Sequence, residues 1–255
     1  MSNKSIYDCP KYYDIAFSYR SYPAEVKVMR EIMRRFSRIP VRRVLEIACG
    51  HCPHARELVR KGYSYTGIDR SGAMLQYARG KIGDGGGGIS LVNANLVDFT
   101  VDEPVDFAFV MLGSLYVRNT AELESHFDAM ARALKSGGLY LLDWVVDFDP
   151  LVDVSVTWKT SRDDIHVKTS YYTSHENRST QVVRETVILE VNDHGECSTI
   201  TSETLKRAIY PQEFLFFLKL RDDFEFVGWW NEWDLDKPME DGEPGNRPIV
   251  VIRRK

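Results

Sequence analysis

Short apolar segments alternate with segments of helical periodicity between residues 43 and 144, and this alternation limits the possible folds more than any other feature. The segments that predict strands are residues 43–48, 63–69, 89–94, 105–112 and 139–144. Apolar residues at helical spacing predict helices at 53–61, 72–82 and 120–134, after an amphipathic helix at 22–38. Such alternation predicts a parallel, doubly wound sheet with helices on its faces.

The pattern changes after Pro150. Residues 157–168, 181–191 and 196–205 predict strands, with a hairpin turn at Asn192-Asp193-His194-Gly195. A helix at 211–220 and two closing strands at 224–230 and 248–253 follow. The predicted fold is therefore α/β, a doubly wound, mostly parallel seven-stranded Rossmann-like sheet with an antiparallel β insertion.

Four parts are expected along the chain. Residues 1–40 form an N-terminal helical segment that closes the site, and residues 41–149 form the ligand-binding core. Residues 150–208 form the antiparallel insertion or cap, and residues 209–255 supply a helix and the closing strands of the core sheet.

The first predicted strand runs into a turn suited to a ligand, with the sequence Glu46-Ile47-Ala48-Cys49-Gly50-His51-Cys52-Pro53. In doubly wound sheets, ligands bind at the carboxyl ends of the strands where the strand order reverses. Gly50 lets the backbone approach a ligand closely. Pro53 is expected at the first position of the next helix, whose N–H groups would face the ligand.

Further polar residues follow the later strands. Asp69 ends the second strand, nineteen residues after Gly50 (69 − 50), where a carboxylate can accept hydrogen bonds from both ribose hydroxyls. Asn95 ends the third predicted strand, and the fourth runs into Met111 and Leu112. These positions can bracket an adenine, so the sequence predicts a nucleoside site at this edge of the sheet.

The ordered strand ends resemble class I S-adenosylmethionine (SAM)-dependent methyltransferases, in their small-molecule, N-methyltransferase-like branch. The motifs that match are Glu46-x-Ala48-x-Gly50-x-Cys52, Gly67-Ile68-Asp69-Arg70-Ser71-Gly72-Ala73-Met74-Leu75, Val105–Val110 and Leu134-Lys135-Ser136-Gly137-Gly138. Tyr12-Tyr13-Asp14 and Tyr210-Pro211-Gln212-Glu213-Phe214 also look like that branch. The resemblance therefore covers nearly the whole chain.

The resemblance implies SAM as the cofactor and methyl transfer to a small-molecule acceptor with an N or O nucleophile, mainly by proximity and orientation. Tyr13 and Tyr19 are expected to fold over the sulfonium, and Tyr116 to face the acceptor. No metal is expected. The residues expected to bind SAM are Glu46, Ala48, Gly50, Cys52, Asp69, Arg70, Met74, Asn95, Leu96, Met111 and Leu112.

Three residues depart from the family pattern. Ala48 and Cys52 stand where the family has glycine, so the turn is expected to avoid positive φ there. Asn95 stands in place of an aspartate, and its side-chain oxygen can still accept a hydrogen bond from the adenine amino group. The altered turn keeps open a second hypothesis, a SAM-binding regulatory protein without turnover.

The tetrapeptide Cys49-Gly50-His51-Cys52 raises a third hypothesis, because it spells the active-site sequence of disulfide isomerases. Ala48 stands where such domains have tryptophan, and Pro104 lies in a polar turn rather than facing the cysteines. A zinc site is disfavoured because ligands within six residues cannot easily surround one ion, and His51 and His54 are expected near the surface. Pro53 opposes a dinucleotide-binding glycine motif.

Composition limits the partners. The net charge of −4 gives no global basic field for binding nucleic acid, and no apolar run reaches the length of a membrane span. Four scattered cysteines predict no disulfide framework, so a cytoplasmic location is expected. The expected partners are a small-molecule acceptor and a second copy of the chain, joined through the β insertion.

Overall fold

A seven-stranded sheet forms the centre of the protein, with strand order β10-β11-β5-β4-β1-β2-β3. The computed structural model describes residues 4–83, 87–149, 153–239 and 246–255. β1 to β5 are mutually parallel, whereas β11 runs antiparallel to β5 and β10. The strands are β1 (Arg43–Ile47), β2 (Ser64–Asp69), β3 (Ile89–Asn93), β4 (Val105–Val110), β5 (Leu134–Asp143), β10 (Phe224–Trp230) and β11 (Ile249–Arg254). The strand order reverses between β1 and β4, where ligands of such sheets bind.

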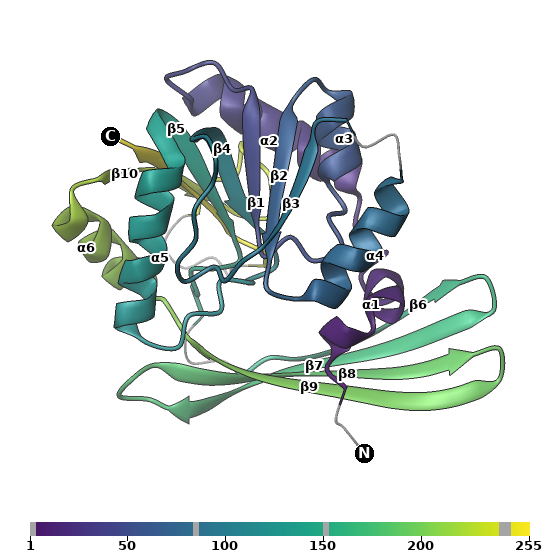
Figure 1. The fold of residues 1–255 in the computed structure, drawn as a ribbon. Coiled ribbons are helices and arrows are strands. Elements are labelled where there is room, and N and C mark those ends of the chain that lie inside the picture. The colour runs from purple at the N-terminus through teal and green to yellow at the C-terminus, as the bar shows by residue number, and fades with distance from the viewer. Residues whose placement is uncertain (1–3, 84–86, 150–152, 240–245) are drawn as a thin grey trace.

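Helices cover both faces of this sheet (Figure 1). One face packs on α5 (Thr120–Ala133) and α6 (Pro211–Arg221) through residues such as Phe127 and Phe214. The other packs on α2 (Tyr22–Phe36), α3 (Ala55–Arg60) and α4 (Gly72–Ile82). Because both faces are covered, β4 is buried along its whole length, as expected of a central parallel strand.

A second, antiparallel sheet lies across one end of the core, with strand order β6-β7-β8-β9 (Figure 1). Its strands are β6 (Ser155–Arg162), β7 (Ile165–Asn177), β8 (Val182–Asp193) and β9 (Glu196–Arg207). Its apolar face packs on η1 (Ile6–Asp8) and α1 (Pro10–Ala16), through residues such as Val167, Leu189 and Ile15. The N-terminal segment is thereby held between the second sheet and α4.

The predicted fold class is confirmed: the sheet is doubly wound and mostly parallel, and the antiparallel insertion forms a sheet of its own. The division at residues 40, 149 and 208 stays a prediction, and residues 150–152 beside the second boundary lie outside the described residues. A subunit contact through the insertion also stays a prediction. Within the described ranges, no helix is both long and apolar enough to cross a membrane.

Two predicted boundaries are wrong. Residues 157–168 form two strands rather than one, because Asp163 adopts a left-handed conformation (φ 52°) in a hairpin that contains no glycine to announce it. β5 begins at Leu134 instead of residue 139, so Gly137 and Gly138, which precede the predicted strand, lie inside it. A Cβ on Gly138 would come within 2.8 Å of the Asp106 carbonyl oxygen, so this glycine permits close strand packing.

Substitution of Phe127 tests the packing between α5 and α6. It is fully buried and its ring lies against those of Phe214, Phe217 and Phe224. We expect Phe127→Ala to lower the free energy of unfolding by about 3–5 kcal/mol, measured by urea denaturation. The control is Phe216→Ala on the same helix pair, because Phe216 is 65% exposed and should matter by less than about 0.5 kcal/mol. Equal effects from both variants would contradict this packing.

Candidate active site

The turn after β1 adopts left-handed backbone conformations at all three positions of the glycine motif. The φ angles are 51° at Ala48, 53° at Gly50 and 55° at Cys52. The expectation that the turn avoids positive φ at Ala48 and Cys52 is therefore wrong. Tertiary hydrogen bonds hold the turn, since Cys49 N–H donates to the Ile68 carbonyl (2.9 Å), and strain of this kind persists only where the surroundings impose it.

Asp69, at the end of β2, ties this turn to the start of α4. Its Oδ2 accepts from Gly50 N–H and its Oδ1 from Ser71 N–H, both at 2.7 Å. Burial raises the pKa of Asp69, although the two backbone N–H groups oppose that shift. A carboxylate has about four acceptor sites, so Asp69 retains capacity for two further hydrogen bonds.

A narrow cavity of about 70 Å³ lies beside Gly50 and Asp69. It is lined by Tyr7, Tyr13, Ala48, Gly50, Ile68, Asp69, Arg70, Ser71, Met74, Ala94, Asn95, Leu96, Ser114 and Tyr116. Most of the residues expected to bind SAM are thus brought together here. Ser114, which follows Met111 and Leu112 in the segment expected to bracket an adenine, lines it as well. Tyr7 and Ser71 also line it and were not expected.

Five expected site residues lie elsewhere. Glu46, Cys52 and Met111 are buried behind the cavity and do not line it. Leu112 and Tyr19 line a second, larger cavity. α3 begins at Ala55 instead of Pro53 and has only six residues, so its N-terminus does not supply the row of N–H groups that the sequence suggested.

Glu46 belongs to a buried chain of hydrogen bonds. It accepts from the Tyr65 hydroxyl (2.5 Å) and lies 2.8 Å from His54 Nδ1, whose Nε2 lies 2.8 Å from Glu25 Oε2. The expectation that His51 and His54 lie near the surface is wrong, since they are 5% and 0% exposed. Burial disfavours a charged His54, but the two carboxylates outweigh it and raise the pKa of His54.

Glu25 extends this chain of hydrogen bonds to arginines near the two termini of the sequence. It forms ion pairs with Arg20 (2.7 Å) and Arg247 (3.0 Å), and Arg247 also pairs with Asp143 at the end of β5 (2.8 Å). Although burial raises the pKa of Glu25, hydrogen bonds and charges from His54 and Arg20 lower it to about 2. Asp143 in turn accepts from Leu112 N–H (2.8 Å), which connects the network to the larger cavity.

The two cysteines of the turn have the properties of core residues. Their Sγ atoms are 3.4 Å apart and unbonded, and both side chains are buried. Burial raises the pKa of Cys49 well above its usual range. Redox-active thiols need a lowered pKa and access to solvent, so the site opposes the oxidoreductase hypothesis.

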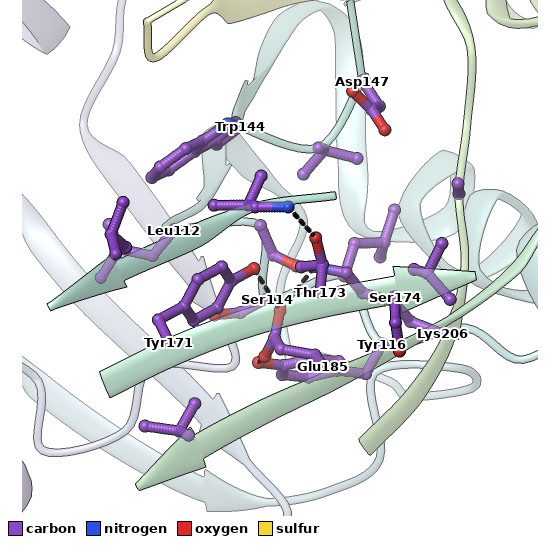
Figure 2. Close-up of a pocket in the computed structure, with 18 of the residues that line it drawn as sticks. Leu112, Ser114, Tyr116, Trp144, Asp147, Tyr171, Thr173, Ser174, Glu185 and Lys206 are labelled. Atoms are coloured by element: carbon purple, nitrogen blue, oxygen red, sulfur yellow. Dashed lines mark hydrogen bonds and ion pairs between the residues drawn. The ribbon is translucent and has the colours of Figure 1, made fainter. Parts of the chain in front are cut away.

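The larger cavity has a volume of about 710 Å³ and lies between the core and the second sheet (Figure 2). Aromatic and aliphatic residues such as Phe17, Trp144 and Trp158 form much of its wall. Tyr7, Tyr13, Ser114 and Tyr116 line both cavities. We call these four residues the junction.

Four carboxylates line the larger cavity, and none of them was expected from the sequence. Asp149 and Asp153 are exposed, whereas Asp147 and Glu185 are more deeply placed. Glu185 is buried beside Lys206 (2.8 Å), and Figure 2 shows both grouped with Tyr116 and Tyr171. Asp147 follows β5 and lies apart from this group (Figure 2). Glu185 had a signal in the sequence, because strand alternation places it on the same face as Val183, Val187 and Leu189.

Comparison with known proteins gives a partial family match. Residues 44–138 match a family model described as a methyltransferase domain. A protein named as a methyltransferase from Geobacillus sp. (strain WCH70) is 26% identical over 133 residues, which is 52% of this chain and 54% of that protein. The match therefore spans about half the length of this curated relative.

Solved structures share the fold over nearly the whole chain. A SAM-dependent methyltransferase from Clostridium acetobutylicum ATCC 824 is 17% identical, with a TM-score of 0.77 and coverage of 95% of this chain and 96% of that chain. A sugar N-methyltransferase from Streptoalloteichus sp. ATCC 53650 is 21% identical, with a TM-score of 0.74 and coverage of 95% and 92%. This chain thus shares its fold with these two methyltransferases.

Residues 44–138, which the family model matches, supply the strained turn and Asp69, whereas much of the larger cavity comes from outside them. Tyr7 and Tyr13 precede the matched residues, and Asp147 and Glu185 follow them. The wall of the larger cavity is therefore built largely by the parts of the chain that the family model does not describe.

The strain in the turn is measurable. We expect Ala48→Gly to raise the free energy of unfolding by about 0.5–1 kcal/mol, because glycine adopts φ 51° without a steric penalty. Gly50→Ala should lower the free energy of unfolding. An added Cβ would meet no atom within 4 Å, so the cost would come only from backbone strain. Ala78→Gly, in the middle of α4, is the control and should destabilise. A destabilised Ala48→Gly variant would contradict strain at Ala48.

His54 predicts a pH dependence of stability. Its pKa is raised in the folded protein, so its contribution is present below the unfolded pKa of about 6.5 and is lost as pH rises through the folded pKa. The difference in unfolding free energy between wild type and His54→Gln should therefore shrink above about pH 6.5. His166→Gln, exposed on β7, is the control and should leave the profile unchanged. A difference that is constant from about pH 5.5 to 9 would contradict this role.

Proposed function

We propose that this protein is a SAM-dependent methyltransferase that methylates an amine on a small molecule. The observation that carries the proposal is the junction: a cavity beside the strained turn and Asp69 shares Tyr7, Tyr13, Ser114 and Tyr116 with a large, mostly apolar cavity. A cofactor in the first and an acceptor in the second would meet there. Ligand sites of enzymes commonly combine apolar walls with a few polar groups in this way.

The residues around the smaller cavity suit SAM. Asp69 has acceptor capacity for ribose hydroxyls, and Gly50 leaves open space where a side chain would begin. Asn95 Oδ1 already accepts from Val97 N–H (3.1 Å), and its second lone pair could accept from an adenine amino group. Since 70 Å³ is far below the roughly 300–1,000 Å³ of ligand pockets, we propose that Tyr13 moves outward when SAM enters, while Tyr7 keeps its hydrogen bond to Tyr116 (3.1 Å).

The junction favours a nitrogen nucleophile. SAM, when bound, supplies an electrophilic methyl group on a sulfonium. Burial raises the pKa of Tyr7, Tyr13 and Tyr116, so these phenols stay neutral near pH 7 and none serves as a base. An amine needs only its neutral lone pair, whereas an oxygen or carbon acceptor needs a general base. We therefore propose that the tyrosines exclude water and orient the reactants.

Asp147 supports an amine acceptor as well. Its carboxylate lines the larger cavity and accepts one hydrogen bond, from Asp149 N–H (3.0 Å). Burial raises the pKa of Asp147, and it forms no ion pair with any residue that the structure describes. A half-buried carboxylate in this situation attracts a cation, and most alkyl amines arrive in the protonated form. The ammonium proton must leave before nitrogen attacks, and the Asp147 carboxylate, whose pKa is raised, would accept it. Two structural neighbours are named as a sugar N-methyltransferase and an amino pentose methyltransferase, which also supports the proposal.

Asp69→Ala tests the cofactor site. We expect it to weaken SAM binding by about 2–3 kcal/mol, the scale of losing hydrogen bonds to a charged acceptor, measured by isothermal titration calorimetry. Asp98→Ala is the control: this aspartate comes after β3, pairs with Arg132, does not line the cavity and should leave the affinity unchanged. Unchanged affinity in a folded Asp69→Ala protein would remove Asp69 from the SAM site.

The acceptor class is tested by turnover. Formation of S-adenosylhomocysteine is followed with matched sets of small amines and alcohols that carry the same apolar groups. We expect turnover with amines only. Methylation of the alcohols would contradict the nitrogen acceptor, and SAM binding without turnover would favour the SAM-binding regulatory protein instead.

A further inference from the structure

Glu185 occupies an unusual position in the second sheet. It lies on the apolar face of β8, between Val183 and Val187, and is 5% exposed. A buried ion pair adds little to stability compared with apolar side chains of similar size. The pair that Glu185 forms with Lys206 therefore requires an explanation other than stability.

The contacts of Glu185 point to the junction. Its Oε1 accepts from the Tyr116 hydroxyl at 2.5 Å, and its Oε2 accepts from the Tyr171 hydroxyl at 2.9 Å and from Lys206 Nζ at 2.8 Å. Figure 2 shows Tyr116, Tyr171 and Lys206 around this carboxylate. The Tyr7 hydroxyl donates in turn to the Tyr116 hydroxyl oxygen at 3.1 Å.

The direction of these hydrogen bonds is fixed by the carboxylate. An ionised carboxylate only accepts, so the Tyr116 hydrogen points to Glu185 and the Tyr7 hydrogen points to Tyr116. Burial alone would raise the pKa of Glu185, but Lys206 and the two hydroxyls lower it, so the carboxylate remains ionised near neutral pH. The Tyr7 hydroxyl hydrogen is used in the bond to Tyr116, so the Tyr7 oxygen can present only its lone pairs to the cavities.

We propose that Glu185 is a positioning residue that orients the hydroxyls of Tyr116 and Tyr7. Their oxygen lone pairs would then face the place where the two cavities meet and stabilise positive charge there. The inference rests on the proposed function, because the positive charge is that of the SAM sulfonium. Oriented dipoles of this kind stabilise charge without having to reorganise. Glu185, on the second sheet, would thus affect the cofactor through Tyr116 and Tyr7, which lie outside that sheet.

The test compares two ligands that differ in charge at sulfur. We measure the affinities of Glu185→Gln for SAM and for the neutral S-adenosylhomocysteine by isothermal titration calorimetry. The expected result is a loss of about tenfold in SAM affinity relative to S-adenosylhomocysteine, the scale of one hydrogen bond to a charged group. Glu190→Gln is the control, because Glu190 lies on the opposite face of β8 and is exposed.

A second pair of variants separates positioning from scaffolding, including the case in which Glu185→Gln fails to fold. Tyr116 and Tyr171 donate to the same carboxylate, but Tyr171 lines only the larger cavity. Tyr116→Phe should reproduce the loss of SAM preference, and Tyr171→Phe should not. Equal effects of the two, or equal weakening of both ligands in Glu185→Gln, would overturn the inference.

Failure of the proposed function gives a different result. A wild-type protein that binds neither SAM nor S-adenosylhomocysteine would remove the proposed function, and this inference with it. A wild-type protein that binds SAM and turns over, together with a Glu185→Gln variant of unchanged ligand preference, would overturn the inference alone.

Discussion

The hydrogen bonds of His54 with Glu25 and Glu46 connect parts of the chain that would otherwise meet only through apolar packing. They join α2 to β1, and Arg247 continues the chain of contacts to Asp143 on β5. Buried charges are stable only when each has a partner of good geometry, so removing one member leaves the others uncompensated. Glu46, the first acid of the family motif, consequently belongs to this framework and not to the cavity wall.

The largely buried network of Glu25, Glu46, His54, Asp143 and Arg247 allows the neighbouring turn to keep an unfavourable backbone conformation. Ala48 and Cys52 adopt a conformation that glycine adopts freely, and Asp69 fastens the turn by accepting from Gly50 N–H. Local rules are broken most often where a functional site imposes its own geometry. The strained turn and the carboxylate that holds it lie at the same edge of the sheet, where β1 and β4 separate.

Local sequence signals predicted the sheet and its main helices because they depend on near neighbours. Ser71 and Asn119 cap their helices as such residues do, and His194-Gly195 forms the expected hairpin turn. The hairpin at Asp163 had no glycine to mark it. The burial of His54 depends on Glu25, twenty-nine residues away, and the cluster at Glu185 depends on Tyr116, sixty-nine residues away, so no local pattern could reveal either.

Asp147 and Glu185, the two less exposed of the carboxylates that line the larger cavity, differ in what surrounds them, and this difference suggests different roles. Glu185 is compensated by Lys206 and two hydroxyls, so it has little left to offer a ligand and is suited to orienting its neighbours. Burial raises the pKa of Asp147 although the charge of Lys206 opposes that shift, and Asp147 forms no ion pair among the described residues, so it is suited to binding a cation that arrives from outside. We therefore propose that one carboxylate serves the cofactor side of the reaction and the other serves the acceptor. Both lie outside residues 44–138, the part of the chain that the family model matches.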